Sequence, residues 1–343
     1  MRQRSTWLLA SAAALGAALL GTAWLWFAQA PAAQRSTAPS ATAQPLTIAV
    51  STAYAGSCPV LAASDRGFFK AEGVTATVQP HSSGKSALNA VLEKKAELAT
   101  VAELPVMFAA MSGQPVMVLA NMFRTERDAG VIVRKDRGIA APADLKGKRV
   151  GVQLGTAAHF MLEVFLGLQK LSTRDVTLVD LPTHELSNAL SQGVVDAVAT
   201  WEPHLDSMRA MLGPNGTVFY GERVYSYFLL AGMRDQVRAQ PQAVQGVLRA
   251  VVRGAQYCAE APAAAAALLA SPTKPDPVRA AELWRGYRFD VSLEQSLLLA
   301  LEDESRWAIQ NKLVAGSSTP NYLDHLHLDA LMAVRPAAVT VIH

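Results

Sequence analysis

The sequence predicts an α/β protein of two lobes, each with a mainly parallel sheet flanked by helices, joined by two crossing strands that act as a hinge. Three observations lead to this prediction. Of the 343 residues, 51% are hydrophobic, enough to bury a core for two domains. Strand-like runs alternate with helix-like runs, the order that produces parallel sheets. Residues 46–105 and 149–203 also carry the same pattern, and such similarity indicates a repeated structural unit.

The two copies match at strands, helices and loops. Each copy ends in a carboxylate at the tip of its third predicted strand. A chain that builds one unit twice, with reactive side chains at corresponding tips, is expected to make two facing lobes with a cleft between them. The matched positions are 47–50 with 149–152, 74–75 with 176–177, Asn89 with Asn188, Glu97 with Asp196, and Glu103 with Glu202.

The first thirty residues predict an export signal or a membrane anchor rather than part of the fold. Arg2 and Arg4 precede an uncharged stretch, and residues 28–30 have the Ala-x-Ala form of a cleavage site. The apolar run at 7–28 approaches the roughly 20 residues that cross a bilayer, so an uncleaved anchor stays open. Residues 31–45, rich in Ala, Ser, Thr and Pro, are expected to form a flexible linker.

The expected elements follow from apolar periodicity and turn signals. A helix is expected to start at Pro59 with Ser57 as its cap. Residues 130–134 and 225–231 are interpreted as the two crossing strands, so lobe 1 comprises 46–131 and 232–343 and lobe 2 comprises 132–231. Further strands are expected at 47–51, 74–79, 98–101 and 115–121, and helices at 59–69, 85–93, 105–111, 243–259, 262–270, 277–287 and 293–313.

Composition and motifs exclude several classes of function. The net charge is +3 with scattered basic residues, so no nucleic-acid partner is expected. The chain lacks a Gly-x-Ser-x-Gly elbow, a phosphate-binding loop and Cys/His clusters at zinc spacing, so no catalytic residue, cofactor or metal is predicted. His81 and His159 lie near predicted loops, where a histidine is more often solvated than functional. Whether Cys58 and Cys258 pair stays open.

The loop at 155–157 is the strongest candidate for a ligand contact. Gly155 lets the chain turn, Thr156 can cap the next helix, and Ala157 leaves the first backbone N–H groups open. Such a helix start attracts anions through unpaired donors and the helix dipole. Ser83, in the corresponding loop of the first copy, is expected to face it across the cleft. The alternative is that Thr156 only satisfies its own helix.

Trp201 and Glu202 are the second candidate for a ligand contact, because a tryptophan beside a carboxylate at a strand tip can form an apolar wall for a small ligand. Glu103 occupies the corresponding tip of the first copy. If both carboxylates face the cleft unpaired, the ligand should carry positive charge or hydrogen-bond donors. The alternative is that each accepts hydrogen bonds from neighbouring N–H groups or pairs with a basic residue. Thr52 and Tyr54, after the first strand, complete the predicted ligand-binding residues.

Four stretches together resemble the periplasmic solute-binding proteins of ABC importers in the sulfonate, nitrate, taurine and thiamine-precursor group. The likeness covers nearly the whole chain after the linker. The stretches are ASDRGFFKAEG at 63–73, DLKGKRVGV at 144–152 followed by Gly155 and Thr156, DAVATWEP at 196–203, and PNYLD at 320–324 with VRP at 334–336.

The resemblance implies the type 2 periplasmic-binding-protein fold, whose lobes close over a solute and whose closed form docks on an ABC permease. It implies a protein that is not an enzyme and that works in the periplasm, free or anchored through 7–28. In that family the loop at 155–157 contacts the anionic or polar end of the ligand, and 201–202 lines the pocket. Glu103 departs from a strict anion binder, so we expect an aminosulfonate, sulfonate or pyrimidine/amine-type solute.

Two other functions stay open. A membrane-tethered ligand sensor would use the same lobes, and relatives of this fold include a pyrimidine-forming enzyme of thiamine synthesis. That enzyme needs a cysteine-rich motif and an active histidine, and this chain has no such cluster.

Overall fold

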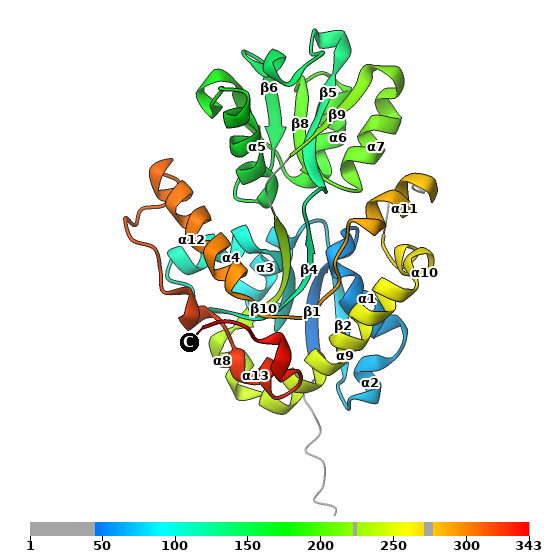
Figure 1. The fold of residues 1–343 in the computed structure, drawn as a ribbon, viewed down its shortest axis with the longest axis vertical. Coiled ribbons are helices and arrows are strands. Elements are labelled where there is room, and N and C mark those ends of the chain that lie inside the picture. The colour runs from blue at the N-terminus through cyan, green and yellow to red at the C-terminus, as the bar shows by residue number, and fades with distance from the viewer. Residues whose placement is uncertain (1–44, 222–224, 271–276, 343) are drawn as a thin grey trace, which may run out of the picture. The chain divides into compact units, whose positions relative to one another are not determined.

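The computed structural model describes residues 45–221, 225–270 and 277–342. These residues build two five-stranded sheets flanked by helices (Figure 1). We call the sheet that contains the first strand, with its helices, lobe 1, and the other sheet with its helices lobe 2. The predicted export signal or anchor lies outside the described residues, as does the linker up to residue 44. None of the described helices is long and apolar enough to cross a bilayer.

The same strand order recurs in the two lobes, which confirms that the sequence repeat is structural. Lobe 1 has the order β2-β1-β3-β10-β4 and lobe 2 the order β7-β6-β8-β5-β9. The sheets are mixed, because β10 and β5 each run antiparallel to both neighbours. The strands of lobe 1 are β1 (Leu46–Ser51), β2 (Ala76–His81), β3 (Leu98–Ala102), β4 (Val116–Thr125) and β10 (Ser226–Met233). Those of lobe 2 are β5 (Ala129–Arg134), β6 (Arg149–Val152), β7 (Thr177–Asp180), β8 (Ala197–Trp201) and β9 (Gly216–Tyr220).

Two carboxylates that match in the repeat make the same hydrogen bond in the two lobes. Glu97 Oε2 accepts the N–H of Thr47 at 2.7 Å, and Asp196 Oδ2 accepts the N–H of Arg149 at 3.0 Å. Hydrogen bonding from the Arg149 guanidinium lowers the pKa of Asp196 from its usual value. Each carboxylate therefore ties the start of the third strand of its lobe to the start of the first.

Helices cover both sheets, and the C-terminal helices pack on lobe 1. Those before β4 are α1 (Cys58–Asp65), α2 (Phe68–Ala71), α3 (Gly84–Leu92) and α4 (Glu103–Met111). Lobe 2 has α5 (Ala157–Leu168), α6 (Thr183–Ser191) and α7 (His204–Leu212). The C-terminal helices are α8 (Arg234–Ala239), α9 (Pro241–Glu260), α10 (Pro262–Ala266), α11 (Pro277–Arg285), α12 (Gln295–Gln310) and α13 (Leu328–Met332). Short 3₁₀ turns are η1 (Ala55–Ser57), η2 (Lys135–Arg137), η3 (Pro142–Leu145), η4 (Thr173–Asp175), η5 (Gly213–Asn215), η6 (Tyr322–His325) and η7 (Pro336–Ala338).

The segment 59–69, predicted as one helix, differs from the prediction. It forms α1 and α2, because Gly67 between them adopts a left-handed conformation with φ of 68°. Ser57 makes no side-chain cap on α1, and its hydroxyl lies 2.9 Å from Thr100 Oγ1 instead.

The crossings between the lobes also lie elsewhere than predicted. The first lies between β4 and β5, and the second between β9 and β10. Because β5 belongs wholly to the sheet of lobe 2, residues 129–131 join that lobe. Because β10 belongs wholly to the sheet of lobe 1, residues 226–231 join lobe 1.

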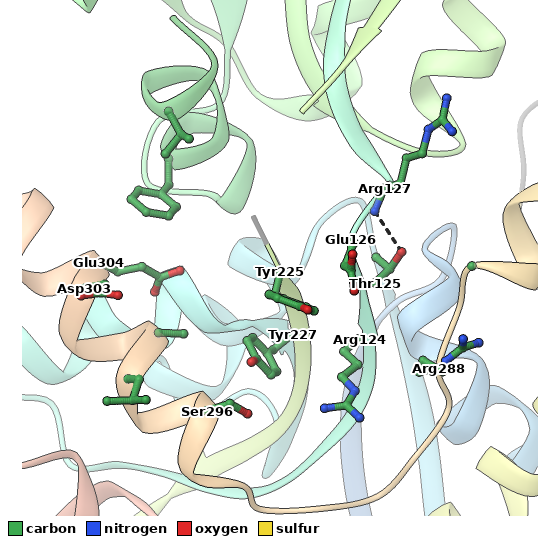
Figure 2. A pocket seen from close by; sticks show the side chains of 15 residues that line it. Arg124, Thr125, Glu126, Arg127, Tyr225, Tyr227, Arg288, Ser296, Asp303 and Glu304 are labelled. Carbon is green, nitrogen blue, oxygen red and sulfur yellow. Dashed lines mark hydrogen bonds between the residues drawn. The ribbon is translucent and has the colours of Figure 1, made fainter. Parts of the chain in front are cut away.

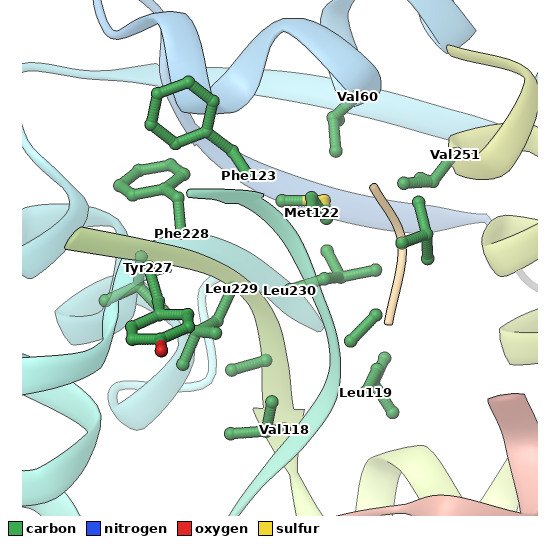
Figure 3. Close-up of a cluster of buried hydrophobic side chains, with 14 of the residues drawn as sticks. Val60, Val118, Leu119, Met122, Phe123, Tyr227, Phe228, Leu229, Leu230 and Val251 are labelled. Atoms are coloured by element: carbon green, nitrogen blue, oxygen red, sulfur yellow. The ribbon is translucent and has the colours of Figure 1, made fainter. Parts of the chain in front are cut away.

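Lobe 1 holds the larger core, centred on β4 and β10. Phe123 of β4 and Leu230 of β10 are fully buried, and Val60 of α1 and Val251 of α9 lie in the same cluster (Figure 3). Since β10 is buried along nearly its whole length, it carries apolar residues on both faces. This rigid centre fixes the position of the strand tips that face lobe 2.

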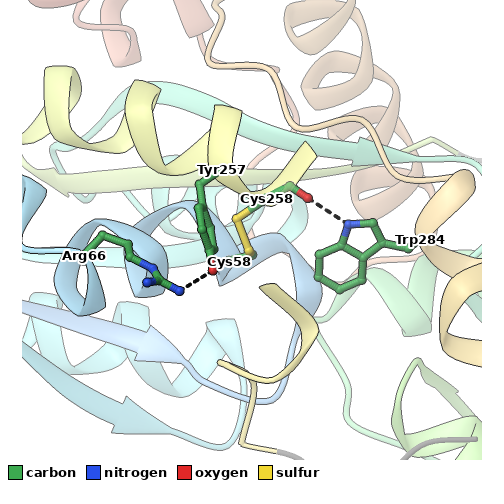
Figure 4. Close-up of a disulfide and its surroundings, with 5 residues drawn as sticks. All are labelled: Cys58, Arg66, Tyr257, Cys258 and Trp284. Carbon is green, nitrogen blue, oxygen red and sulfur yellow. Dashed lines mark hydrogen bonds between the residues drawn. A yellow bond between two sulfur atoms is a disulfide. The ribbon is translucent and has the colours of Figure 1, made fainter. Parts of the chain in front are cut away.

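The question of cysteine pairing is settled by a disulfide between Cys58 and Cys258 (Figure 4). It joins the first residue of α1 to the last turn of α9, with a Cα–Cα distance of 6.2 Å. Both cysteines are fully buried, and the carbonyl of Cys258 accepts a hydrogen bond from Trp284 Nε1 at 2.9 Å. The disulfide therefore fixes α1, which follows the loop after β1, to the C-terminal helices.

Candidate functional site

A narrow cavity lies between the lobes, and we call it the interlobe cavity. Its volume is about 40 Å³, enough for a few water molecules. The tips of strands and the first turns of helices from both lobes line it, together with the strands next to the crossings. The lining residues are Ser51, Tyr54, Gly84, Lys85, Ala102, Pro105, Asp128, Ala129, Thr156, Ala157, Ala158, Trp201, Ser226, Tyr227 and Phe228.

The start of α5 forms the wall contributed by lobe 2. Thr156 makes no side-chain cap on this helix, because its hydroxyl donates to the carbonyl of Gln153 at 2.7 Å. The first N–H groups of a helix have no acceptor inside the helix, so this start presents backbone donors. Ala157 and Ala158 carry only a methyl group, which allows a ligand to approach the backbone. An anion at this point would gain both hydrogen bonds and the helix dipole.

Lys85 of α3 brings a positive charge to the same cavity from lobe 1. Its Nζ donates to the carbonyl of Leu154 in lobe 2 at 2.6 Å. Gly155 has φ of 70°, and a Cβ at this position would lie 3.3 Å from Lys85 Nζ. An ammonium group has three donors, so two of them remain for a ligand after the bond to Leu154. The contact also spans the two lobes and exists only while they are close together.

The wall beside the crossings carries an acid instead. Asp128 is 2% exposed, and its carboxylate accepts a hydrogen bond from the hydroxyl of Tyr54. Burial raises the pKa of Asp128 to about 6, while hydrogen bonds from Tyr54 and Ser226 act in the opposite direction. Burial also raises the pKa of Tyr54, so its hydroxyl keeps its proton and donates to Asp128. The cavity thus has a basic side at Lys85 and an acidic side at Asp128.

Four of the nine predicted ligand-binding residues meet at this cavity: Tyr54, Thr156, Ala157 and Trp201. Three others lie nearby without lining it. The carbonyl of Thr52 accepts the N–H of Ala270 at 2.9 Å, Ser83 caps α3 by accepting the N–H of Ser86 at 3.2 Å, and Gly155 lines a neighbouring groove. Their contact with a ligand stays a prediction.

The two predicted glutamates are held by intramolecular bonds and do not line the cavity. Glu103, 2% exposed, accepts the N–H of Tyr227 at 3.0 Å. Glu202, 3% exposed, accepts the N–H of Asp206 at 3.0 Å and the hydroxyl of Tyr220 at 2.5 Å. This is the alternative arrangement that the sequence had left open. The acid that lines the cavity is Asp128, which sequence reasoning missed.

Lys85, Asp128 and Tyr227 carry the chemistry of this cavity and were absent from the predicted set. Lys85 is the first residue of a predicted helix and follows the loop that holds Ser83. This position close to a predicted ligand-binding residue could have identified Lys85 as a candidate. Asp128 comes just before the predicted strand 130–134 and Tyr227 lies within the predicted strand 225–231, and no motif marks either residue. Their position depends on the pairing of β4 with β10, which a local pattern does not reveal.

A wider cavity of about 820 Å³ lies beside the crossings (Figure 2). Arg124, Tyr225 and Glu304 line it, α5 of lobe 2 contributes the apolar side chains of Phe160 and Val164, and two of its charged side chains form ion pairs within the protein. Arg124 pairs with Glu294 at 2.8 Å, and Asp303 pairs with Arg306. We therefore place the candidate ligand site in the interlobe cavity, where donors from both lobes converge.

Glu304 and Glu103 form a buried carboxyl pair next to that wider cavity, and the pair predicts a pH dependence. Burial raises the pKa of both groups, that of Glu103 to about 8. The folded protein therefore holds protons that the unfolded chain releases above pH 4.5, and stability falls as pH rises from about 5 to 8. Glu304→Gln keeps a donor for Glu103 and removes one acid, so this variant should lose less stability over that range.

The expected gain of Glu304→Gln over wild type at pH 8 is on the order of 1–2 kcal/mol. Urea unfolding at pH 5 and pH 8 measures it. Glu302→Gln on the same helix is the matched control, since Glu302 is 42% exposed and pairs with Arg306. Equal pH profiles for Glu304→Gln and wild type would contradict the prediction.

No group of three or more potential metal ligands occurs among the described residues.

The family model described as NMT1/THI5 like matches residues 55–265 of this chain. A putative aliphatic sulfonates-binding protein of Bacillus subtilis is 28% identical over 151 residues, 43% of this chain and 46% of that protein. The taurine-binding periplasmic protein of Escherichia coli is 24% identical over 148 residues, again 43% and 46%. The chain thus spans about half the length of these curated relatives.

Solved structures show the fold. The alkanesulfonate-binding protein SsuA from Xanthomonas axonopodis pv. citri, bound to MOPS, aligns with a TM-score of 0.72 and 20% identity over 82% of this chain and 97% of that one. The periplasmic nitrate-binding protein NrtA from Synechocystis PCC 6803 aligns with a TM-score of 0.66 and 12% identity over 86% and 90%. The predicted two-lobed periplasmic-binding-protein fold is confirmed.

Proposed function

Because this chain belongs to the NMT1/THI5-like family, we propose that it is an extracytoplasmic solute-binding protein that delivers a small organic solute to an ABC permease. The observation that carries the proposal is the interlobe cavity, where Lys85 of lobe 1 and the uncapped start of α5 in lobe 2 converge. The names of the relatives, which bind sulfonates and taurine, support a solute with an anionic end. Binding without turnover and a periplasmic location belong to the same proposal.

Closure of the lobes would couple binding to delivery. An anion at the start of α5 gains the charge of Lys85 only when the lobes are close, so the solute stabilises the closed form over the open one. The bond from Lys85 Nζ to Leu154 links the lobes in the same place. A permease that recognises the closed form would then receive the loaded protein.

The solute class follows from the two sides of the cavity. Lys85 and the backbone donors of α5 suit a sulfonate or carboxylate. Asp128, which also lines the cavity, suits an amine or a hydrogen-bond donor, although its carboxylate already accepts a hydrogen bond from Tyr54. We therefore keep sulfonates, aminosulfonates and pyrimidine or amine-type compounds as the candidate solutes. Whether the N-terminal segment is cleaved or retained as an anchor is decided by mass spectrometry of the mature protein.

A thermal-shift screen over these compounds tests the proposal, with calorimetry for those that stabilise the protein. A ligand at 100 times its dissociation constant should add about 2.7 kcal/mol of stability. Lys85→Gln should weaken the binding of the best anion roughly 10- to 100-fold, because it removes a charge-assisted hydrogen bond worth about 1.5–3 kcal/mol.

Lys95→Gln is the matched control, since Lys95 is 67% exposed and pairs only with Glu93 among the described acids. It should bind as wild type does. The proposal fails if no compound stabilises the protein, or if a bound compound is consumed.

A further inference from the structure

We propose that Trp307 of α12 is a positioning residue of the ligand site, which holds the start of α5 against lobe 1 by packing on His159 and Phe160. We call these three side chains the aromatic clasp. The inference rests on the proposed function, and it adds a contact that stabilises the closed form whatever the solute. Trp307 does not line the interlobe cavity, so it acts on the solute only through α5.

The rings of the aromatic clasp meet edge to face between the lobes. Trp307 lies on α12, a helix that packs on α4 of lobe 1, and His159 and Phe160 lie in the first turn of α5 in lobe 2 (Figure 1). The ring of Trp307 is centred 5.1 Å from that of His159 and 5.2 Å from that of Phe160, with interplanar angles of 74° and 71°. Aromatic rings attract one another in this geometry.

The aromatic clasp is largely buried while the lobes are close together. Trp307 is 8% exposed and His159 is 4% exposed. Trp307 belongs to the core cluster of lobe 1, and Phe160 packs against that same cluster although its helix belongs to lobe 2. Separation of the lobes would expose these apolar faces to water, so the clasp favours the closed form over the open one.

The clasp also reaches the loop that precedes α5. The N–H of Gly155 donates to His159 Nδ1 at 3.4 Å, and burial lowers the pKa of His159 to about 4, so the neutral ring is able to accept. The ring of Phe108 of α4 is centred 6.4 Å from that of Trp307, and its Cδ2 would lie 3.8 Å from a Cβ at Gly155. Trp307 therefore positions, through His159, the helix start whose backbone donors would meet the anion.

Packing alone accounts for the indole ring of Trp307. Its Nε1 is buried and has no hydrogen-bond partner among the described residues. Because this N–H gains no hydrogen bond, a phenyl ring would keep the contacts and lose only the unpaired donor. Trp307→Phe is therefore the conservative replacement, whereas Trp307→Leu removes the aromatic ring.

Calorimetric titration with taurine and with ethanesulfonate is the first measurement. Trp307→Leu should weaken the binding of both probes about tenfold and by the same factor, because both depend on the same closure. About tenfold is the size expected for the loss of two aromatic pairs. Trp307→Phe should stay within about twofold of wild type. Phe160→Leu removes one of the pairs from the side of lobe 2, so it should weaken both probes about threefold and add little to Trp307→Leu.

Trp284→Leu is the matched control. Trp284 is also 8% exposed in lobe 1, and the rings that it meets, those of Tyr287 and Phe289, belong to lobe 1 as well. This variant should lose stability in urea unfolding as Trp307→Leu does, yet bind both probes with wild-type affinity. A merely structural role for Trp307 predicts the same binding result for the two variants.

Small-angle X-ray scattering without a solute is the second measurement. The radius of gyration of Trp307→Leu should exceed that of wild type and of Trp307→Phe, because the open form is more extended.

The inference and the proposed function fail in distinguishable ways. Wild-type affinity in Trp307→Leu, or equal losses of affinity in Trp307→Leu and Trp284→Leu, overturns the aromatic clasp and leaves the proposed function in place. Failure of every sulfonate, carboxylate and amine to bind rejects the proposed function, and equal radii of wild type and Trp307→Leu then reject the clasp as well.

Discussion

Replacement of both Cys58 and Cys258 by alanine is expected to lower the free energy of unfolding by about 3–5 kcal/mol. The disulfide closes a loop of 200 residues, so its loss releases a large amount of chain entropy in the unfolded state. It also ties α1 to α9 at a fully buried position, where the cysteines help to fill the core of lobe 1. Urea unfolding of the oxidised wild type and the double variant measures the difference.

Wild-type protein unfolded and refolded with a reductant is the control for this measurement. It should match the double variant within about 1 kcal/mol, because both lack the same link. A stability loss below about 1 kcal/mol in both samples would show that the packing of α1 on α9 holds this part of lobe 1 without the covalent bond.

Gly254→Ala should destabilise the protein by about 3 kcal/mol or more, the largest effect expected from adding one methyl group. A Cβ at Gly254 of α9 would lie 2.0 Å from the carbonyl oxygen of Pro59 in α1 and 2.9 Å from its carbonyl carbon. The obstruction is backbone rather than a flexible side chain, so the two helices must separate. Thermal and urea unfolding of the variant measure the loss.

Gly167→Ala provides the matched control, since Gly167 also lies within a helix and a Cβ there would have nothing within 4 Å. Because alanine favours the helix over glycine, this control should be more stable than wild type by about 0.5–1 kcal/mol. Similar stability of the two variants would mean that α9 shifts on α1 at little cost.

The repeated fold could be predicted because its signals are local. The apolar periodicity of each strand and helix can be recognised within a short stretch of each copy. The matched carboxylates Glu97 and Asp196 also lie in such stretches, and both accept the equivalent backbone hydrogen bond in the structure. The start of α5 was found for the same reason, since the turn at Gly155 and the small residues after it are neighbours in the sequence.

The remaining features depend on contacts between distant segments. Glu103 appeared free to face a ligand because its partners Tyr227 and Glu304 come more than 120 residues later. Asp128 lines the interlobe cavity three residues after the end of β4, a strand whose place is set by its pairing with the distant β10. The disulfide joins positions 200 residues apart, and sequence alone does not give their separation in space.

The central place of β10 in lobe 1 has a consequence for how the chain is assembled. All five strands of lobe 2 come from one uninterrupted stretch, β5 to β9, whereas β10 enters between β3 and β4, some hundred residues after β4 has been made. A polypeptide that folds from its N-terminus onward can complete lobe 2 while the edges of β3 and β4 that will pair with β10 are still unpaired in lobe 1. Such edges attract other chains. The last third of the polypeptide, which brings β10, α9 and the second cysteine, therefore closes the domain that began to form first.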